Sequence, residues 1–131
     1  MIKSMDLDLL TTLGRDLYNV WIALSSCRFR FSHEQELVLG IAEALDIAGI
    51  YYEREVRLSK ADSLDFLTAD GTCIEVKVDG SFAEAARQVY RYSMLDRVLA
   101  IIVVTSRSVH REMPEWINGK PVRVLHVRPG L

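Results

Sequence analysis

The 131-residue sequence contains little cysteine, and its two cysteines, Cys27 and Cys73, belong to no close pair and to no cluster with histidine. Zinc and iron–sulfur sites need such clusters, so we expect two reduced thiols and neither kind of site. Long apolar runs are also missing. The longest one, residues 98–104, is seven residues long, whereas a membrane-spanning helix needs about 20. The first residues show no signal peptide, and these absences together predict a cytoplasmic protein with no membrane partner.

The chain also lacks an excess of positive charge, because 16 lysines and arginines face 18 aspartates and glutamates, for a net charge of −2. No overall positive field attracts nucleic acid, so any such binding must come from local patches. Three short basic patches exist, each of which could equally be solvated surface: Arg28 with Arg30, Arg54 with Arg57, and Arg87 with Arg91. Half of the residues are hydrophobic and no repeat or linker is visible, which predicts a single folded domain over residues 1–131.

Hydrophobic spacing and capping residues predict an α/β fold. Apolar residues at helical spacing predict an N-terminal helix over residues 6–24, and a second helix begins at an N-cap, Ser32, with Gln35 completing a capping box, and ends at Gly49. The segments expected after it are strands at 51–58, 64–68 and 73–78, a helix at 82–94 capped by Ser81, a buried strand at 98–105 parallel to the strand before that helix, and a less certain strand at 122–127. This order predicts a central mixed sheet flanked by helices.

Residues 73–78 combine an acid and a lysine on one strand. Apolar side chains alternate there with Glu75 and Lys77, so the two charges should leave the same face of the sheet. A carboxylate beside an ammonium group can hold a metal ion and position the water that the ion activates. An ion pair on a half-solvated strand fits the same pattern, and the triplet Glu75-Val76-Lys77 alone does not decide between the two.

Asp65, in the strand before, is the candidate partner of Glu75, and the length of the connecting turn decides whether they meet. A two-residue turn would pair Asp65 with Val76, whereas a three-residue turn pairs Asp65 with Glu75. We expect the three-residue turn, because Gly71 then occupies the position that requires a left-handed residue. Asp62 is the competing acid, but it lies three positions farther along the strand.

Asp65, followed after nine residues by Glu75-Val76-Lys77, resembles the motif of the PD-(D/E)XK nuclease superfamily. The resemblance covers residues 32–105, with 6–24 as an extra N-terminal helix and 106–131 as a C-terminal strand region. It implies a restriction-endonuclease-like core of αβββαβ order. The proline that precedes the aspartate in the family is Leu64 here, a departure that does not touch the chemistry.

The resemblance also implies the roles of the site residues. Asp65 and Glu75 would bind Mg²⁺ or Mn²⁺ as hard oxygen ligands, with the backbone carbonyl of Val76 as a third ligand. Lys77 would orient or help to deprotonate the attacking water and stabilise charge at the phosphate. The metal ion would lower the pKa of that water and neutralise the transition state.

The predicted helix before the sheet carries two further candidate metal ligands. Glu36 occupies the helix on which many family members have an additional acid, and His33 stands one helical turn before it. Some RecB-like members use a histidine on this helix as a ligand. We prefer Glu36, although the two side chains are three residues apart on one helix face and could act together.

Gln88 and Tyr92, on the predicted helix after the lysine strand, fit the Gln-x-x-x-Tyr motif of the RecB-like and phage-exonuclease branches. In those branches the pair helps to place the DNA, whereas core packing is the alternative for Tyr92. Arg87 and Arg91 form a second pair four residues apart that could reach DNA phosphates, with solvated surface as the alternative for Arg87.

These expectations describe a metal-dependent deoxyribonuclease directed by DNA structure or a strand end, acting alone or as a homodimer. RNA as a substrate stays open. Holliday-junction resolvases share the size and plan, while the Gln-x-x-x-Tyr match favours exonuclease-like relatives. A non-catalytic nucleic-acid-binding or assembly subunit that keeps the fold is the alternative. A third possibility is an unrelated enzyme in which Glu75 and Lys77 are structural, with Asp65 on the opposite sheet face.

Overall fold

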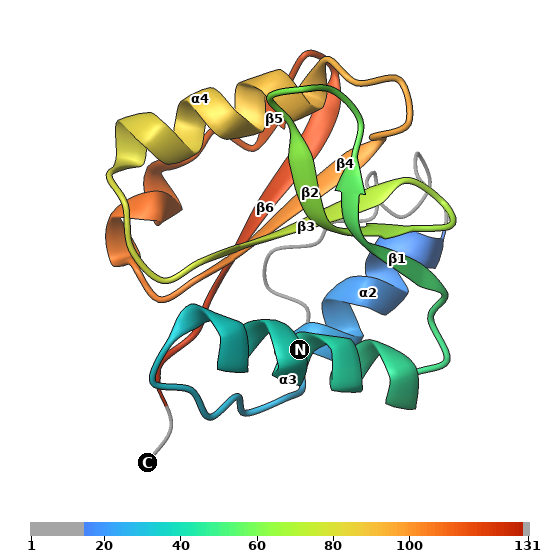
Figure 1. The fold of residues 1–131 in the computed structure, drawn as a ribbon, viewed down its shortest axis with the longest axis vertical. Coiled ribbons are helices and arrows are strands. Elements are labelled where there is room, and N and C mark those ends of the chain that lie inside the picture. The colour runs from blue at the N-terminus through green and yellow to red at the C-terminus, as the bar shows by residue number, and fades with distance from the viewer. Residues whose placement is uncertain (1–14, 130–131) are drawn as a thin grey trace.

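The computed structural model describes residues 15–129, which form three α-helices, a short 3₁₀ helix and a six-stranded mixed sheet (Figure 1). In chain order the elements are α2 (Arg15–Ser25), α3 (Glu34–Ile47), β1 (Tyr52–Arg57), β2 (Ser63–Thr68), β3 (Thr72–Lys77), α4 (Phe82–Ser93), β4 (Ala100–Thr105), η1 (Ser108–Glu112), β5 (Trp116–Ile117) and β6 (Lys120–His126). The predicted α/β class and the order of its main elements are confirmed. Of the predicted helix over 6–24, residues 6–14 lie outside the described residues.

The strands lie in the order β1-β2-β3-β4-β6-β5. β1, β2 and β3 form an antiparallel meander, and β4 and β6 continue the sheet in parallel with β3, as the buried sequence of β4 predicts. Helices α2 and α3 pack on one face of the sheet and α4 on the other (Figure 1). Each face buries its own apolar cluster, here called the α3-side cluster and the α4-side cluster, so the functional candidates must lie between two packed layers.

Helices α3 and α4 begin differently from each other. At α4, Ser81 forms the predicted N-cap and makes a reciprocal capping box with Glu84. At α3 the prediction of Ser32 as N-cap is wrong by one residue, because the N-cap is His33, whose side chain makes no capping hydrogen bond. The N–H and the hydroxyl of Ser32 both donate to the Glu36 carboxylate over 2.8 Å, so the side chain that turns back here is that of Glu36 and not that of Gln35.

The C-terminal region adds a hairpin that the sequence signalled only as turns. β5 pairs with the start of β6 through Asn118 and Gly119, which have φ angles of 53° and 75°. Two successive left-handed residues are typical of a type I′ turn. The expected last strand is thereby confirmed as β6, with a short partner at the edge of the sheet.

The structure also describes the two cysteines and the lengths of the helices. Cys27 is exposed and Cys73 is buried, and both are free thiols. Within residues 15–129, every helix is too short or too polar to cross a membrane.

Candidate active site

The turn between β2 and β3 has the three-residue length on which the sequence argument depends. Phe66 is the partner of Ile74, and the same register places Asp65 opposite Glu75. Gly71 has a φ angle of 90°, and its N–H donates to the carbonyl oxygen of Thr68 over 3.1 Å. The predicted three-residue turn with a left-handed glycine is therefore confirmed.

β2 and β3 separate at the position of the two carboxylates. Their paired residues end at Phe66 and Ile74, although β2 continues along β1 to Ser63 and β3 continues along β4 to Lys77. Each strand is thus held by its outer neighbour while the two inner edges lose contact. Asp65 is the first residue of β2 inside this gap, and Glu75 and Lys77 follow on β3.

Asp65 lies at a break in the β1–β2 ladder as well. Arg54 pairs with Phe66 and Val56 pairs with Leu64, but no pair is formed between them, where Glu55 has a φ angle of 51°. On either side of this break the side chains change face: Phe66 belongs to the α3-side cluster, and Leu64 belongs to the α4-side cluster. The backbone turns over at Asp65, which frees its side chain from the normal alternation of the strand.

The carboxylate of Asp65 points across the gap to β3. Its Oδ2 atom accepts a hydrogen bond from the N–H of Val76 over 2.8 Å, and its own N–H donates to Oε1 of Glu75 over 3.5 Å. The ammonium nitrogen of Lys77 lies 3.8 Å from Oε2 of Glu75. Glu75 is only 4 % exposed, whereas Lys77 is half-buried at the mouth of the gap. The arrangement joins two acids and one cation, as the sequence predicted for Asp65, Glu75 and Lys77.

Burial changes the protonation of the two acids. Loss of hydration raises the pKa of Glu75 to about 8, the charge of Asp65 adds to this rise, and Lys77 opposes it. Burial also raises the pKa of Asp65, against the Val76 N–H and the charge of Lys77, both of which lower it. The Glu75 side chain also lowers the pKa of Asp65. The pair therefore shares a proton near neutral pH, which is how two neighbouring acids avoid carrying two charges in one buried place.

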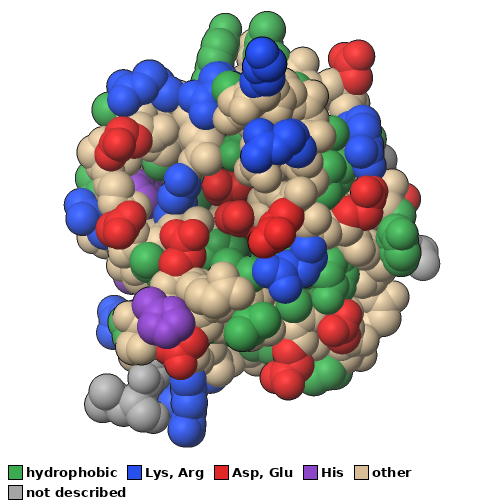
Figure 2. Space-filling model, viewed as in Figure 1, with side chains coloured by type: hydrophobic (Ala, Val, Ile, Leu, Met, Phe, Trp, Pro, Cys, Tyr) green, Lys and Arg blue, Asp and Glu red, His purple; other side chains and the backbone are tan. Residues whose placement is uncertain are grey.

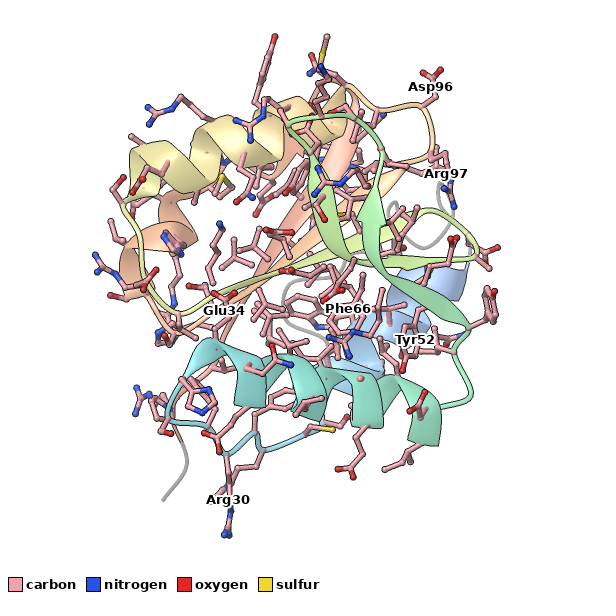
Figure 3. The ribbon with its side chains drawn as sticks, viewed as in Figure 1. Arg30, Glu34, Tyr52, Phe66, Asp96 and Arg97 are labelled. Carbon is pink, nitrogen blue, oxygen red and sulfur yellow. The ribbon has the colours of Figure 1, made fainter. Side chains whose placement is uncertain are left out.

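A third acid, the exposed Glu34 of α3, interacts electrostatically with this group, whereas the expected Glu36 does not. Burial raises the pKa of Glu34, the charge of Asp65 raises it further, and Lys77 lowers it. Figure 3 shows Glu34 pointing from the first turn of α3 toward the sheet. Glu36 is exposed and bonded to Ser32, so the structure does not bring it to the pair.

The sequence contains a signal for Glu34 that the motif comparison missed. Leu37, Val38 and Ile41 form the buried stripe of α3, and Glu34 precedes Leu37 and Val38 by three and four residues, which places it on the same helix face. His33, the other candidate on this segment, has a side chain that is 64 % exposed and lies 3.7 Å from Oε1 of Glu36. His33 and Glu36 therefore form a surface pair outside the gap.

The α4 residues support β2 from the other side. The hydroxyl of Tyr92 donates to the carbonyl oxygen of Ser63 over 3.1 Å and accepts a hydrogen bond from Nε2 of Gln88 over 2.7 Å. Tyr92 is 1 % exposed, so its ring is part of the α4-side cluster. The motif pair Gln88 and Tyr92 therefore ties α4 to the beginning of β2, and only Gln88 is in reach of a ligand.

The two arginines of α4 differ in what they contact. Nε of Arg91 donates to Oδ1 of Asp62 over 2.9 Å. Asp62, the acid that competed with Asp65 in the sequence, is buried and also accepts from the Ser59 hydroxyl. Arg87 is exposed.

On the face seen in Figure 2, acidic side chains gather in the middle between α3 and α4, with lysines and arginines around them.

The donor atoms in the gap are of the type that Mg²⁺ and Mn²⁺ prefer. The carboxylates of Asp65, Glu75 and Glu34 and the carbonyl oxygen of Val76 are hard oxygen ligands. They fit such an ion by type. In residues 15–129, however, no three histidine, cysteine, aspartate or glutamate side chains stand close enough together to hold a metal ion.

Comparisons of this chain with known protein families, with curated proteins and with solved structures found no match.

Proposed function

We propose that this protein is a metal-dependent deoxyribonuclease with the restriction-endonuclease-like core of the PD-(D/E)XK superfamily. The observation that carries the proposal is the gap between β2 and β3, in which Asp65 and Glu75 oppose each other with Lys77 two residues farther along. The motif resemblance requires these three residues to meet.

The free-energy cost of burying Asp65 and Glu75 supports a functional role for these acids. Glu75 is almost completely buried, and its pKa is raised because its ionised form loses hydration and faces Asp65. A buried carboxyl pair destabilises the folded state when it is ionised, and an apolar pair would pack in its place without that cost. Strongly shifted acids that share a cleft with a lysine are typical of catalytic sites, although structural networks also produce such shifts.

Each residue has a role in the proposed hydrolysis. Asp65, Glu75, Glu34 and the Val76 carbonyl would hold Mg²⁺ or Mn²⁺, which when bound supplies Lewis-acid charge at the phosphate and a water of lowered pKa. Glu75 must release its proton before it can act as a ligand. Lys77, at the mouth of the gap, would hold the attacking water or neutralise charge that develops on the phosphate.

The direct test is cleavage of labelled duplex, single-stranded and branched DNA with Mg²⁺, with Mn²⁺ and with EDTA. We expect cleavage by the wild type only with metal, and a loss of about 100-fold or more in Lys77→Ala, the size typical of a lost acid–base or charge-stabilising group. Lys60→Ala is the matched control, because Lys60 is exposed on the β1–β2 connection. Equal metal-dependent rates for wild type and Lys77→Ala would overturn the assignment of the site.

A non-catalytic nucleic-acid-binding or assembly subunit is the second candidate. The observation that favours it is the hydrogen bond from Val76 to Asp65, which occupies a carboxylate that a metal ion would need. No cleavage by the wild type on any of these substrates, together with measurable DNA binding, would favour this subunit over the nuclease.

A further inference from the structure

Arg54 is a half-buried arginine with one buried donor that has no acceptor. Its Nε atom is buried and makes no hydrogen bond, and none of the ion pairs of residues 15–129 includes it. Its guanidinium carbon lies 5.5 Å from the centre of the Phe66 ring. Buried donors in folded proteins are nearly always satisfied, so an orphaned one needs a reason.

The carboxylates next to Arg54 in the sequence form no ion pair with it. Glu53 accepts a hydrogen bond from Arg97 over 2.7 Å. Glu55 occupies the break in the β1–β2 ladder, with its left-handed backbone. Arg91, by contrast, forms an ion pair with Asp62. Arg54 thus packs on Phe66 and belongs to no ion pair within residues 15–129, and Asp65 is the acid on which its charge acts.

The position of Arg54 connects it to the gap. It pairs with Phe66, the residue next to Asp65, and its side chain is half-buried rather than enclosed. Its charge acts on Asp65 from β1, as the charge of Lys77 does from β3. Phe66 and Tyr52 lie between the sheet and α3 (Figure 3), so Arg54 approaches the gap from the α3 side.

We propose that Arg54 binds a phosphate of the nucleic-acid backbone at the α3 side of the gap. The inference rests on the proposed function for the position of the nucleic acid. A guanidinium group presents a planar fork of donors that matches two phosphate oxygens, and a phosphate supplies the negative charge for an ion pair that Arg54 does not form within residues 15–129. The Phe66 ring orients the guanidinium group, so little side-chain freedom is lost when the phosphate binds.

The test is DNA binding without metal. Affinity of a fluorescent 20-base-pair duplex is measured in EDTA from 50 to 300 mM NaCl for the wild type, Arg54→Gln, Arg54→Met and Arg54→Lys. Removing one phosphate contact should lower the slope of log K against log salt by about one and weaken binding roughly tenfold at low salt. Arg54→Lys should keep most of the slope, because it keeps the charge.

Arg57→Gln is the matched control. Arg57 stands on the same strand, is exposed, and donates to the Lys60 carbonyl oxygen. We expect this variant to keep the wild-type slope. Arg54→Met is the control for loss of folding. It keeps an apolar side chain on Phe66 and removes the unpartnered donor, so its melting temperature should equal or exceed that of the wild type. Wild-type slope and affinity in both Arg54→Gln and Arg54→Met would overturn the proposal, as would an absence of DNA binding by the wild type.

Three further outcomes distinguish the phosphate contact of Arg54 from the nuclease activity and from a site for free phosphate. DNA binding that depends on Arg54 in a protein that cleaves no DNA would support the phosphate contact and reject the nuclease. Cleavage that is insensitive to Arg54, with an unchanged salt slope, would reject the contact and leave the nuclease standing. Stabilisation by inorganic phosphate that needs Arg54, with no effect of Arg54 on DNA binding, would indicate a site for free phosphate and overturn the nucleic-acid assignment.

Discussion

Oδ2 of Asp65 accepts a hydrogen bond from the backbone N–H of Val76 over 2.8 Å, so a side chain of β2 bonds β3 at a point where the backbone ladder between them has already ended. The same Asp65 has no partner in the β1–β2 ladder. A carboxylate that spans a gap between two strands can change its partner without breaking sheet pairing. In the proposed function, Asp65 would exchange the Val76 N–H for a metal ion while the pairing of β2 with β1 and of β3 with β4 stays intact.

Glu34→Gln should impair the proposed site, and Glu36→Gln should not. Both side chains are exposed, but Glu34 interacts electrostatically with Asp65 and Lys77, whereas Glu36 is bonded to Ser32. We expect the metal concentration needed for half-maximal cleavage to rise about 10- to 100-fold in Glu34→Gln, a range typical of residues that support a metal site. Metal titration of cleavage measures it. A larger effect from Glu36→Gln would restore the choice made from sequence.

The wild type should lose stability as the pH rises from about 5 to 8 in EDTA. Burial and the charge of Asp65 raise the pKa of Glu75 from 4.5 to about 8, so in this window the folded protein keeps a proton that the unfolded chain has lost. The free energy of unfolding therefore falls with rising pH, by at most about 1.4 kcal/mol per pH unit. Urea denaturation across this range measures the fall.

Glu75→Gln is the control for this pH dependence. The glutamine side chain cannot ionise, so the variant should show a flatter profile and exceed the wild type in stability near pH 8. If Mg²⁺ or Mn²⁺ binds at the pair, either ion should stabilise the wild type more at pH 8 than at pH 5.5, because binding must displace the shared proton. Identical profiles for wild type and Glu75→Gln would contradict the buried acid pair.

Gly71→Ala should destabilise the protein by about 2–4 kcal/mol. Gly71 has a φ angle of 90°, and an added Cβ would stand 2.9 Å from Cγ of Leu99 and 3.0 Å from the Arg97 carbonyl oxygen. Gly49→Ala is the comparison, since Gly49 also has a left-handed backbone, with a φ angle of 73°, but has nothing within 4 Å of the Cβ position. We expect it to cost only about 1 kcal/mol. Urea denaturation of the two variants gives the difference, and equal losses would show that the clash at Gly71 relaxes.

Tyr92→Phe should weaken stability without weakening DNA binding. The Tyr92 hydroxyl joins Gln88 to the Ser63 carbonyl, and loss of this link should cost about 1 kcal/mol. Tyr90→Phe, on an exposed position of the same helix, should be neutral. Thermal melts and metal-free duplex binding measure both effects. A loss of DNA affinity with unchanged stability would show that Tyr92 contacts DNA, as the motif resemblance implied.

Local signals in the sequence determined most of the fold and the register that places Asp65 opposite Glu75. Gly71 specified the turn, because few other residues adopt its backbone conformation, and the turn length set Asp65 opposite Glu75. Ser81 and Glu84 set the start of α4 in the same way, through hydrogen bonds between near neighbours. Such features depend on residues close together in the chain, so they can be read without a structure.

Only the tertiary structure decided which side chains enter the gap. Packing of the apolar stripe sets the rotation of α3 about its axis, and that rotation brings Glu34 to the pair and leaves Glu36 in solvent. Separate pairing of β2 with β1 and of β3 with β4 opened the gap itself. Arg54 was one of several ambiguous basic residues in the sequence. Its lack of a partner follows from contacts between strands and helices that are distant in the chain, which no local pattern encodes.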